Sequence, residues 1–394
     1  MLVEKIRSLA RNYASDFIAV RRHLHAHPEL SYQEFETSKF IQEKLRSFGI
    51  PFRVMAETGV VGMIRGVNPE KRVVALRADM DALPIREQND VPYRSVREGL
   101  MHACGHDVHT TCLLGAARIL NELREDWEGT IKLIFQPGEE KNPGGASLLI
   151  RDGVLRDPEP QAIFAMHVHP GLETGKVSFR SGKVMASADE LYFTIKGQGG
   201  HAASPHAAVD PILIASHLVL ALQQVVSRNN NPFNPCVLSI TSFQGGTTTN
   251  VIPSEVKLMG TFRAMDEEWR HRALELIRAR STSLVESMGG ELDIHIDRGY
   301  PAVHNDEKLD QLAREKAIEY FGAGNVEETE LRMGAEDFGF YAQQIPACFY
   351  RVGVRNESKG ITAGVHTARF DVDEDAIEVG IGMMALLGSS VTMR

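Results

Sequence analysis

Residues 101–109 read Met-His-Ala-Cys-Gly-His-Asp-Val-His and hold one thiol, three imidazoles and one carboxylate. Thiolate and imidazole together bind a Zn²⁺-like ion at neutral pH, so this density of donors predicts one half of a metal site. The plain alternative is a polar loop with an incidental buried Cys104. An amphipathic helix is expected from about Asp107 to Leu123, with Cys112 on its apolar face and therefore in the core.

The whole chain has 394 residues, enough for two domains, and its 43% hydrophobic and 24% charged residues are ordinary for a globular protein. A net charge of −9 without a run of Lys or Arg argues against nucleic acid as a partner. We expect no membrane span and no signal peptide, because apolar stretches are short and residues 1–10 interleave charged with apolar side chains. A cytoplasmic protein without a disulfide framework is therefore expected.

Three short apolar runs are expected to be strands of a parallel sheet, and each leads into side chains that can bind metal. The runs and the residues that follow them are 73–76 with Asp79 and Asp81, 131–135 with Glu139 and Glu140, and 162–166 with His167. Ligands of an open α/β sheet bind beyond the carboxyl ends of its strands, so these side chains are expected to converge. A single strand that ends in acidic residues would be an ordinary solvated loop, whereas three together predict a site.

The pattern changes between residues 183 and 297, where strand and helix signals follow the ferredoxin-like order βαββαβ. We therefore expect an inserted domain at 183–297 within an α/β domain formed by residues 1–182 and 298–394. The sheet of this larger domain is expected to be mixed, mostly parallel and flanked by helices.

Nine motifs occur in order along nearly the whole chain. They are residues 22–29 (RHLHAHPE), 77–84 (RADMDALP), 102–109 (HACGHDVH), 136–140 (QPGEE), 166–170 (MHVHP), 199–203 (GGHAA), 250–253 (NVIP), 334–338 (GAEDF) and 365–367 (VHT). Together they resemble the dinuclear metallo-amidohydrolases, a family with a zinc-peptidase-like catalytic domain. It includes hippurate hydrolases, aminoacylases and auxin-conjugate hydrolases, and it is related to carboxypeptidase G.

The resemblance implies two divalent metal ions with Cys104 as the bridging ligand. Glu140 and His366 would complete one ion, and His106 and His167 the other. The carboxypeptidase branch of the family has an Asp at the bridging position, where this chain has Cys104. A thiolate suits Zn²⁺, which is the expected metal, while Mn²⁺, Co²⁺ and Ni²⁺ stay open as alternatives.

The resemblance also implies that Glu139 is the general base. A carboxylate that lies beside two cations without binding them can take a proton from the attacking water and pass it to the leaving amine. Without the resemblance, Glu139 and Glu140 could both be exposed loop acids. Asp81 is expected to accept the second ring N–H of His106 rather than to bind metal, because ligating imidazoles usually have such a partner.

Three residues of the inserted domain are further candidates. The resemblance implies that His201 stabilises the oxyanion, often across a dimer interface; otherwise it is a surface loop histidine. Asn250 and Arg263 are candidates for binding a substrate carboxylate, since a guanidinium matches a carboxylate bidentately. Arg263 could equally form a surface salt bridge.

Other residues are expected to be structural. His23, His25 and His27 lie at the end of the first helix, where histidine commonly caps the last carbonyls. Asp79 is expected to do no more than hold its loop, and His109 is expected to be structural or to support a ligand.

We therefore expect a metal-dependent amidohydrolase that cleaves N-acyl amino acids, with acetyl, benzoyl or similar acyl groups, into a carboxylate and a free amino acid. A dipeptidase or carboxypeptidase with the same dinuclear site is the alternative. A module that binds ligand without chemistry is a third hypothesis, which the spare acid Glu139 disfavours. The resemblance implies a homodimer or homotetramer joined through the inserted lid and dimerisation domain.

Overall fold

The computed structural model describes residues 2–390, and the chain divides into two compact units. Unit 1 comprises Met1–Val184, His304–Glu330 and Phe340–Arg394, and unit 2 comprises Met185–Val303 and Leu331–Gly339. Residues 331–339 belong to unit 2 because the N–H of Ala186 lies 3.1 Å from the carbonyl oxygens of both Arg332 and Gly334. The sequence boundaries, placed at 182/183 and 297/298, did not include this segment.

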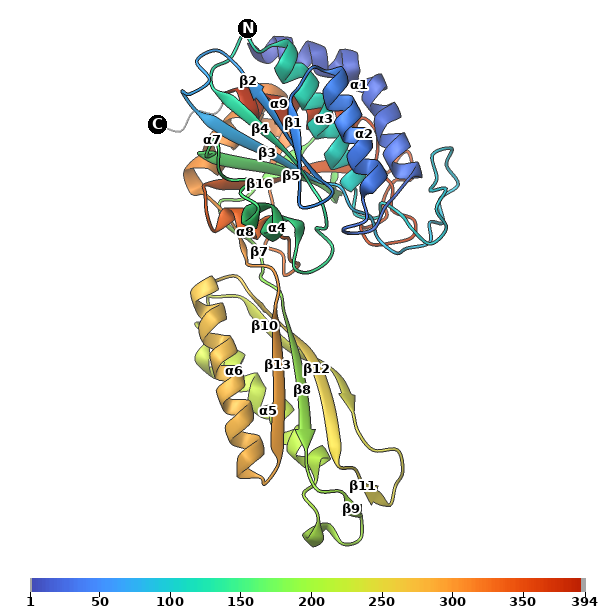
Figure 1. Ribbon diagram of the computed structural model, residues 1–394, viewed down its shortest axis with the longest axis vertical. Coiled ribbons are helices and arrows are strands. Elements are labelled where there is room, and N and C mark those ends of the chain that lie inside the picture. Colours follow the sequence, from blue (N-terminus) through green and yellow to red (C-terminus); the bar gives the residue numbers. More distant parts are fainter. Residues whose placement is uncertain (1, 391–394) are drawn as a thin grey trace. The chain divides into compact units, whose positions relative to one another are not determined.

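Unit 1 is built on an eight-stranded sheet (Figure 1). In spatial order its strands are β1 (Phe52–Met55), β2 (Gly59–Arg65), β4 (Thr130–Gln136), β3 (Val73–Asp79), β5 (Ala162–Glu173), β16 (Ala347–Arg355), β6 (Val177–Phe179) and β15 (Val326–Glu328). Strands β4, β3, β5 and β16 are mutually parallel, whereas β1, β2 and β6 enter antiparallel pairs. This confirms the expected mixed, mostly parallel sheet.

Helices flank this sheet. They are α1 (Leu2–Ala26), α2 (Phe35–Ser47), α3 (His106–Glu122), α4 (Gly145–Arg151), α7 (Glu307–Phe321), a 3-10 turn (Ala323–Asn325) and α9 (Ala376–Ser390). Helices α3 and α9 pack on the central strands, and α1 packs on both helices. Every residue of β3 and β4 is buried, as expected for strands covered on both faces. Cys112 of α3 is fully buried, which confirms its predicted place in the core.

Unit 2 has the predicted order βαββαβ. Its elements are β8 (Asp189–Lys196), α5 (Pro211–Gln224), β10 (Cys236–Gln244), β12 (Glu255–Ala264), α6 (Glu267–Ser287) and β13 (Glu291–Arg298). The antiparallel sheet runs β10-β12-β8-β13, and both helices share one hydrophobic core with it (Figure 1). Short elements complete the chain: β7 (Gly182–Met185), β9 (Gly200–His201), a 3-10 turn (Pro205–Ala207), a π turn (Val225–Asn229), β11 (Val251–Ile252), β14 (Val303–Asn305) and α8 (Gly339–Ala342).

One helical segment corrects the expectation that no apolar stretch is long enough to span a membrane. Residues 211–229, which are α5 and the π turn, are long and apolar enough by length and composition alone. Ile214, Leu218 and Leu222 of this segment are buried against the sheet of unit 2. One face of the segment therefore packs in the core of unit 2, while Leu213 and Leu220 are exposed.

Candidate metal centre

The candidate ligands of unit 1 meet in two groups that share Cys104. In the first group the Sγ of Cys104 lies 3.4 Å from Nε2 of His167, and His106 completes the group. In the second group Sγ lies 3.3 Å from Nε2 of His366, which lies 3.1 Å from Oε1 of Glu140. Within each group the donor atoms all lie within 4.8 Å of one another. One thiol thus faces two sets of nitrogen and oxygen donors.

The backbone places this thiol at a sharp turn between the sheet and α3. Gly105 has a φ of 87°, and a Cβ there would lie 2.5 Å from a methyl carbon of Val168. Glycine therefore allows Cys104 and His106 to flank the turn. His366 has a φ of 61°, which is rare for a residue other than glycine, and its N–H donates to the carbonyl of Ala103 at 2.8 Å. Strained backbone of this kind is concentrated at functional sites.

The ring orientations of two histidines fit a metal. Nδ1 of His106 donates to the carbonyl of Asp81 at 2.9 Å, and Nδ1 of His167 donates to the carbonyl of Val168 at 2.8 Å. Each imidazole therefore turns its Nε2 toward the centre. Nε2 of His106 is buried and makes no hydrogen bond with any described residue. Buried polar atoms normally have a partner, and one thiol with imidazoles and a carboxylate is a donor set that Zn²⁺ accepts.

Three of the candidate ligands hold their protons more tightly than usual when no cation is bound. Hydrogen bonds to Cys104 and Glu140 raise the pKa of His366 to about 10. Burial, followed by the charge of Glu140, raises the pKa of the Cys104 thiol. Although burial lowers it, the charges of Asp79 and Cys104 hold the pKa of His106 above its ordinary value. A cation would have to displace these protons, so the affinity of the site for metal depends on pH.

The carboxylate of Asp81 contacts His106 and also holds the loop that follows β4. Its Oδ1 lies 3.2 Å from Nδ1 of His106. Its two carboxylate oxygens also accept the backbone N–H groups of Glu139 at 3.0 Å and Glu140 at 2.9 Å, and the hydroxyl of Ser31 donates to it at 2.7 Å. The same carboxylate therefore fixes an imidazole and the loop that follows β4.

Glu34 holds the start of that loop and was not foreseen from the sequence. Its Oε1 accepts the N–H of Gly138 at 2.8 Å, and its Oε2 accepts the hydroxyl of Thr58 at 2.9 Å. Glu34 is fully buried, and burial, followed by the charge of Asp81, raises its pKa to about 7. Three successive N–H groups, those of residues 138–140, are thus held by two buried carboxylates. Glu34 stands between Gln33 and the exposed Phe35, and this local sequence gives no sign that Glu34 is buried.

Asp79 does more than hold its loop. It is fully buried and accepts hydrogen bonds from Arg77 at 2.7 Å and from Nδ1 of His109 at 2.5 Å. Nε2 of His109 in turn accepts the N–H of Val168 at 2.9 Å. Because Val168 follows His167 in β5, this chain of contacts fixes the strand at the point where His167 faces Cys104.

Glu139 is placed beside the donor groups. Its side chain is 6% exposed, and one of its carboxylate oxygens lies within 4.8 Å of ligand atoms of both His106 and Glu140. The alternative that Glu139 and Glu140 are both exposed loop acids is wrong, because neither is exposed.

The histidines at the end of α1 differ from one another. Nδ1 of His27 donates to the carbonyl of His23 at 2.8 Å, which is the expected capping contact. The expectation that His25 also caps the helix is wrong. His25 is fully buried and contacts Asp107 at 2.8 Å and Glu87 at 3.1 Å, because α1 packs against α3.

In unit 2 the structure brings His201 and Asn250 together but separates Arg263 from them. His201 is exposed on β9 opposite Val251, and the N–H of Ala202 donates to the carbonyl of Asn250 at 3.0 Å. Arg263 lies near the far end of β12, where its Nε donates to Thr261 at 3.2 Å. The eight steps along the strand from residue 255 to residue 263 span about 26 Å.

Comparisons with known proteins agree with this geometry. Residues 75–389 match Peptidase family M20/M25/M40. The chain is 42% identical over 309 residues to an N-acyl-L-amino acid amidohydrolase of Geobacillus stearothermophilus, covering 78% of this chain and 83% of that protein. It is 38% identical over 391 residues to thermostable carboxypeptidase 2 of Saccharolobus solfataricus, covering 98% of both chains.

A solved structure extends the comparison. The Bacillus subtilis YXEP protein, described as a dinuclear metal-binding peptidase of the M20 family, is similar with a TM-score of 0.83 and 35% identity over 96% of this chain and 98% of that one. The family match and these relatives together cover nearly all of the sequence. The chain therefore belongs to Peptidase family M20/M25/M40 and is a hydrolase of that family.

Proposed function

We propose that this chain cleaves the amide bond of N-acyl amino acids, adding water to give a carboxylate and a free amino acid, with two divalent ions at the centre. The observation that carries the proposal is the position of the Cys104 thiol between two donor groups. The ligands would be Cys104, His106, Glu140, His167 and His366, and the donor set favours Zn²⁺. When bound, two such ions lower the pKa of a shared water and polarise the amide carbonyl.

Glu139 would act as the general base. Its carboxylate lies beside the donor groups without being needed in either, so it can take a proton from the attacking water and deliver it to the nitrogen of the leaving amine. Asp81 would support this step by fixing both the N–H of Glu139 and the imidazole of His106. The loop would then change little during the reaction.

His201 would stabilise the oxyanion, with Asn250 beside it to orient the substrate. Both lie beyond the end of β8 that is farther from Met185, where the chain enters unit 2. We propose that they serve a second copy of the chain in a homodimer or homotetramer. Exposed apolar side chains on α5 and on the edge strand β10 support assembly through unit 2, namely Leu213, Leu220, Val237 and Phe243. Arg263 would bind a different part of the substrate, or it would only stabilise its own strand through Thr261.

The location of the protein is proposed to be the cytoplasm. Its four cysteines are all free, including the Cys104 thiol that the metal needs. A reducing compartment preserves such thiols.

The test is release of free amine from a panel of N-acetyl and N-benzoyl amino acids and from matched dipeptides, with and without a chelator and with Zn²⁺ or Mn²⁺ added back. Chelator-sensitive cleavage of the acylated substrates alone would support the proposal. Cleavage of dipeptides alone would favour the peptidase alternative, to which the name of the Saccharolobus relative also points. Binding of an acylated substrate without turnover under any metal would contradict both.

A further inference from the structure

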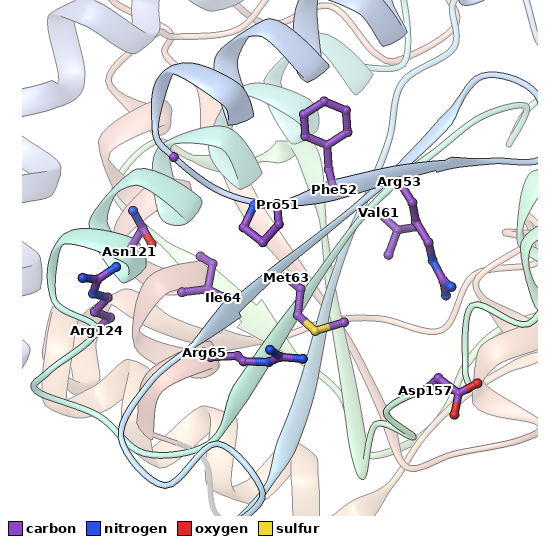
Figure 2. Close-up of a pocket in the computed structure, with 11 residues that line it drawn as sticks. Pro51, Phe52, Arg53, Val61, Met63, Ile64, Arg65, Asn121, Arg124 and Asp157 are labelled. Atoms are coloured by element: carbon purple, nitrogen blue, oxygen red, sulfur yellow. The ribbon is translucent and has the colours of Figure 1, made fainter.

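A cavity of about 450 Å³ lies in unit 1 along β1 and β2 (Figure 2). It is formed around Arg65, the last residue of β2, which pairs with Thr130 at the start of β4. The centre lies past the other end of β4, after Gln136. Arg65 is therefore six strand steps, about 20 Å, from that end of β4, while Val61 of the same cavity pairs with Ile134 and is nearer to it.

One face of the strands supplies the cations and the apolar floor of this cavity. Arg53 of β1 pairs directly with Val61 of β2, and Val61, Met63 and Arg65 alternate along β2. Directly paired residues and residues two apart share a face, so these four side chains lie on the same side of the sheet. Figure 2 shows the side chain of Arg53 beside Val61 and that of Arg65 beside Met63. Among the described residues that line the cavity, Asp157 is the one acid.

The guanidinium groups of Arg53 and Arg65 have no hydrogen-bond or ion-pair partner among residues 2–390. Other arginines of this unit do have such partners. Arg22 forms an ion pair with Glu374 at 2.5 Å, and Arg151 with Asp152 at 3.1 Å. Two unpaired guanidinium groups over one cavity leave a positive potential in a chain whose net charge is −9.

A buried lysine adds to this potential independently. Lys132 pairs with Met63, so it lies on the same face, and it is fully buried. Its ammonium donates to the carbonyls of Val154, Arg156 and Pro158 at 2.7–2.9 Å, and no described carboxylate lies within 4 Å of it. Burial, followed by the charge of Arg53, lowers its pKa to about 8. The charge of Asp157 opposes this shift, and an anion bound in the cavity would act in the same direction.

We propose that this cavity binds a small organic anion, with its phosphate or carboxylate group on Arg53 and Arg65 and its apolar part on Val61 and Met63. A guanidinium matches either group bidentately, and the volume suits a small molecule. None of the residues that line the cavity belongs to the metal centre. The site is therefore separate from hydrolysis, and the proposal does not rest on the proposed function.

The experiment is calorimetric titration of the metal-loaded enzyme at low ionic strength with phenyl phosphate, inorganic phosphate and benzyl alcohol. Phenyl phosphate is expected to bind at least about tenfold more tightly than inorganic phosphate, and more weakly as salt is added. Equal affinity for the two phosphates would overturn the apolar part of the site.

Variants locate the binding. Arg53→Gln and Arg65→Gln should each weaken binding of phenyl phosphate by about tenfold and leave hydrolysis of an acylated substrate unchanged. Arg11→Gln is the matched control, because it removes the same charge from a side chain of unit 1 that is 78% exposed and lies outside the cavity. Wild-type affinity in both cavity variants would place the phosphate elsewhere, the metal centre included, and would overturn the proposal.

Discussion

The carboxylate of Asp81 accepts the backbone N–H of Glu139 at 3.0 Å. Asp81, which supports His106, therefore also positions the proposed base Glu139, although 58 residues separate Asp81 from Glu139 in the sequence. A substitution of Asp81 should therefore change both metal binding and proton transfer. Separating the two effects requires substitutions at other residues, such as Glu139 for proton transfer and Cys104 for metal binding.

Glu139→Ala should keep the metal and lose the chemistry, because the side chain is not needed in either donor group. We expect the metal content to stay at the wild-type level and kcat to fall by about 10²- to 10⁴-fold. Elemental analysis and steady-state kinetics on the same preparation check this. More than a tenth of the wild-type activity would exclude Glu139 as the base.

Cys104→Ala should lose metal, because its thiol is the only donor that both groups share. Chelation of the wild-type enzyme should have the same effect on activity, and addition of Zn²⁺ should restore the wild type but not the variant. Cys112→Ala is the control for removal of a buried thiol in the same helix region. Full metal occupancy in the Cys104 variant would contradict the bridging role.

Asp81→Asn should weaken metal binding and catalysis together. An amide offers one acceptor oxygen, so it cannot accept the N–H groups of both Glu139 and Glu140 in the present geometry. Loss of a group that supports a ligand typically costs about 10- to 100-fold in metal affinity or activity. Ser31→Ala removes only one hydrogen bond to Asp81 and is the milder control. A change in kcat with unaltered metal affinity would show that Asp81 acts only through the loop.

Glu34→Gln should change how stability depends on pH. The pKa of Glu34 is raised from 4.5 to about 7, so between these values the folded state binds more protons than the unfolded state. The free energy of unfolding therefore falls as pH rises through this window, by about 3 kcal/mol for this group. Glutamine does not titrate, and its oxygen can still accept the N–H of Gly138.

The measurement is urea unfolding of both metal-free proteins at pH 5 and pH 8. The variant should gain stability relative to the wild type at the higher pH. A difference between the two proteins that is the same at both values would show that Glu34 does not titrate in this window.

The local hydrophobic pattern was enough to predict the longer helices and strands. The runs at 73–76 and 131–135 are continuous apolar stretches, and they form the core of β3 and β4 because a parallel strand must be buried on both faces. The helix expected from 107 begins at His106 in the structure. The dense donors of residues 101–109 and the acids after the strands likewise predicted a metal site, because the carboxyl ends of the parallel strands of one sheet converge.

Three short strands at or next to the edges of the sheet could not be predicted in the same way. β1, β6 and β15 have three or four residues, too few to show a period, and they form only because a neighbouring strand offers free hydrogen-bonding groups.

Only the tertiary structure decided which polar residues are buried together. Glu34 meets Gly138 across 104 residues, and Asp79 meets His109 across 30, through contacts that no local period encodes. The same holds for His25, whose sequence position suggests a helix cap and whose packing makes it part of the core. Composition and hydrophobic period determine which segments form helices and strands, because both act over a few residues. Packing determines which side chains lose water and must find a partner, and that depends on the whole chain.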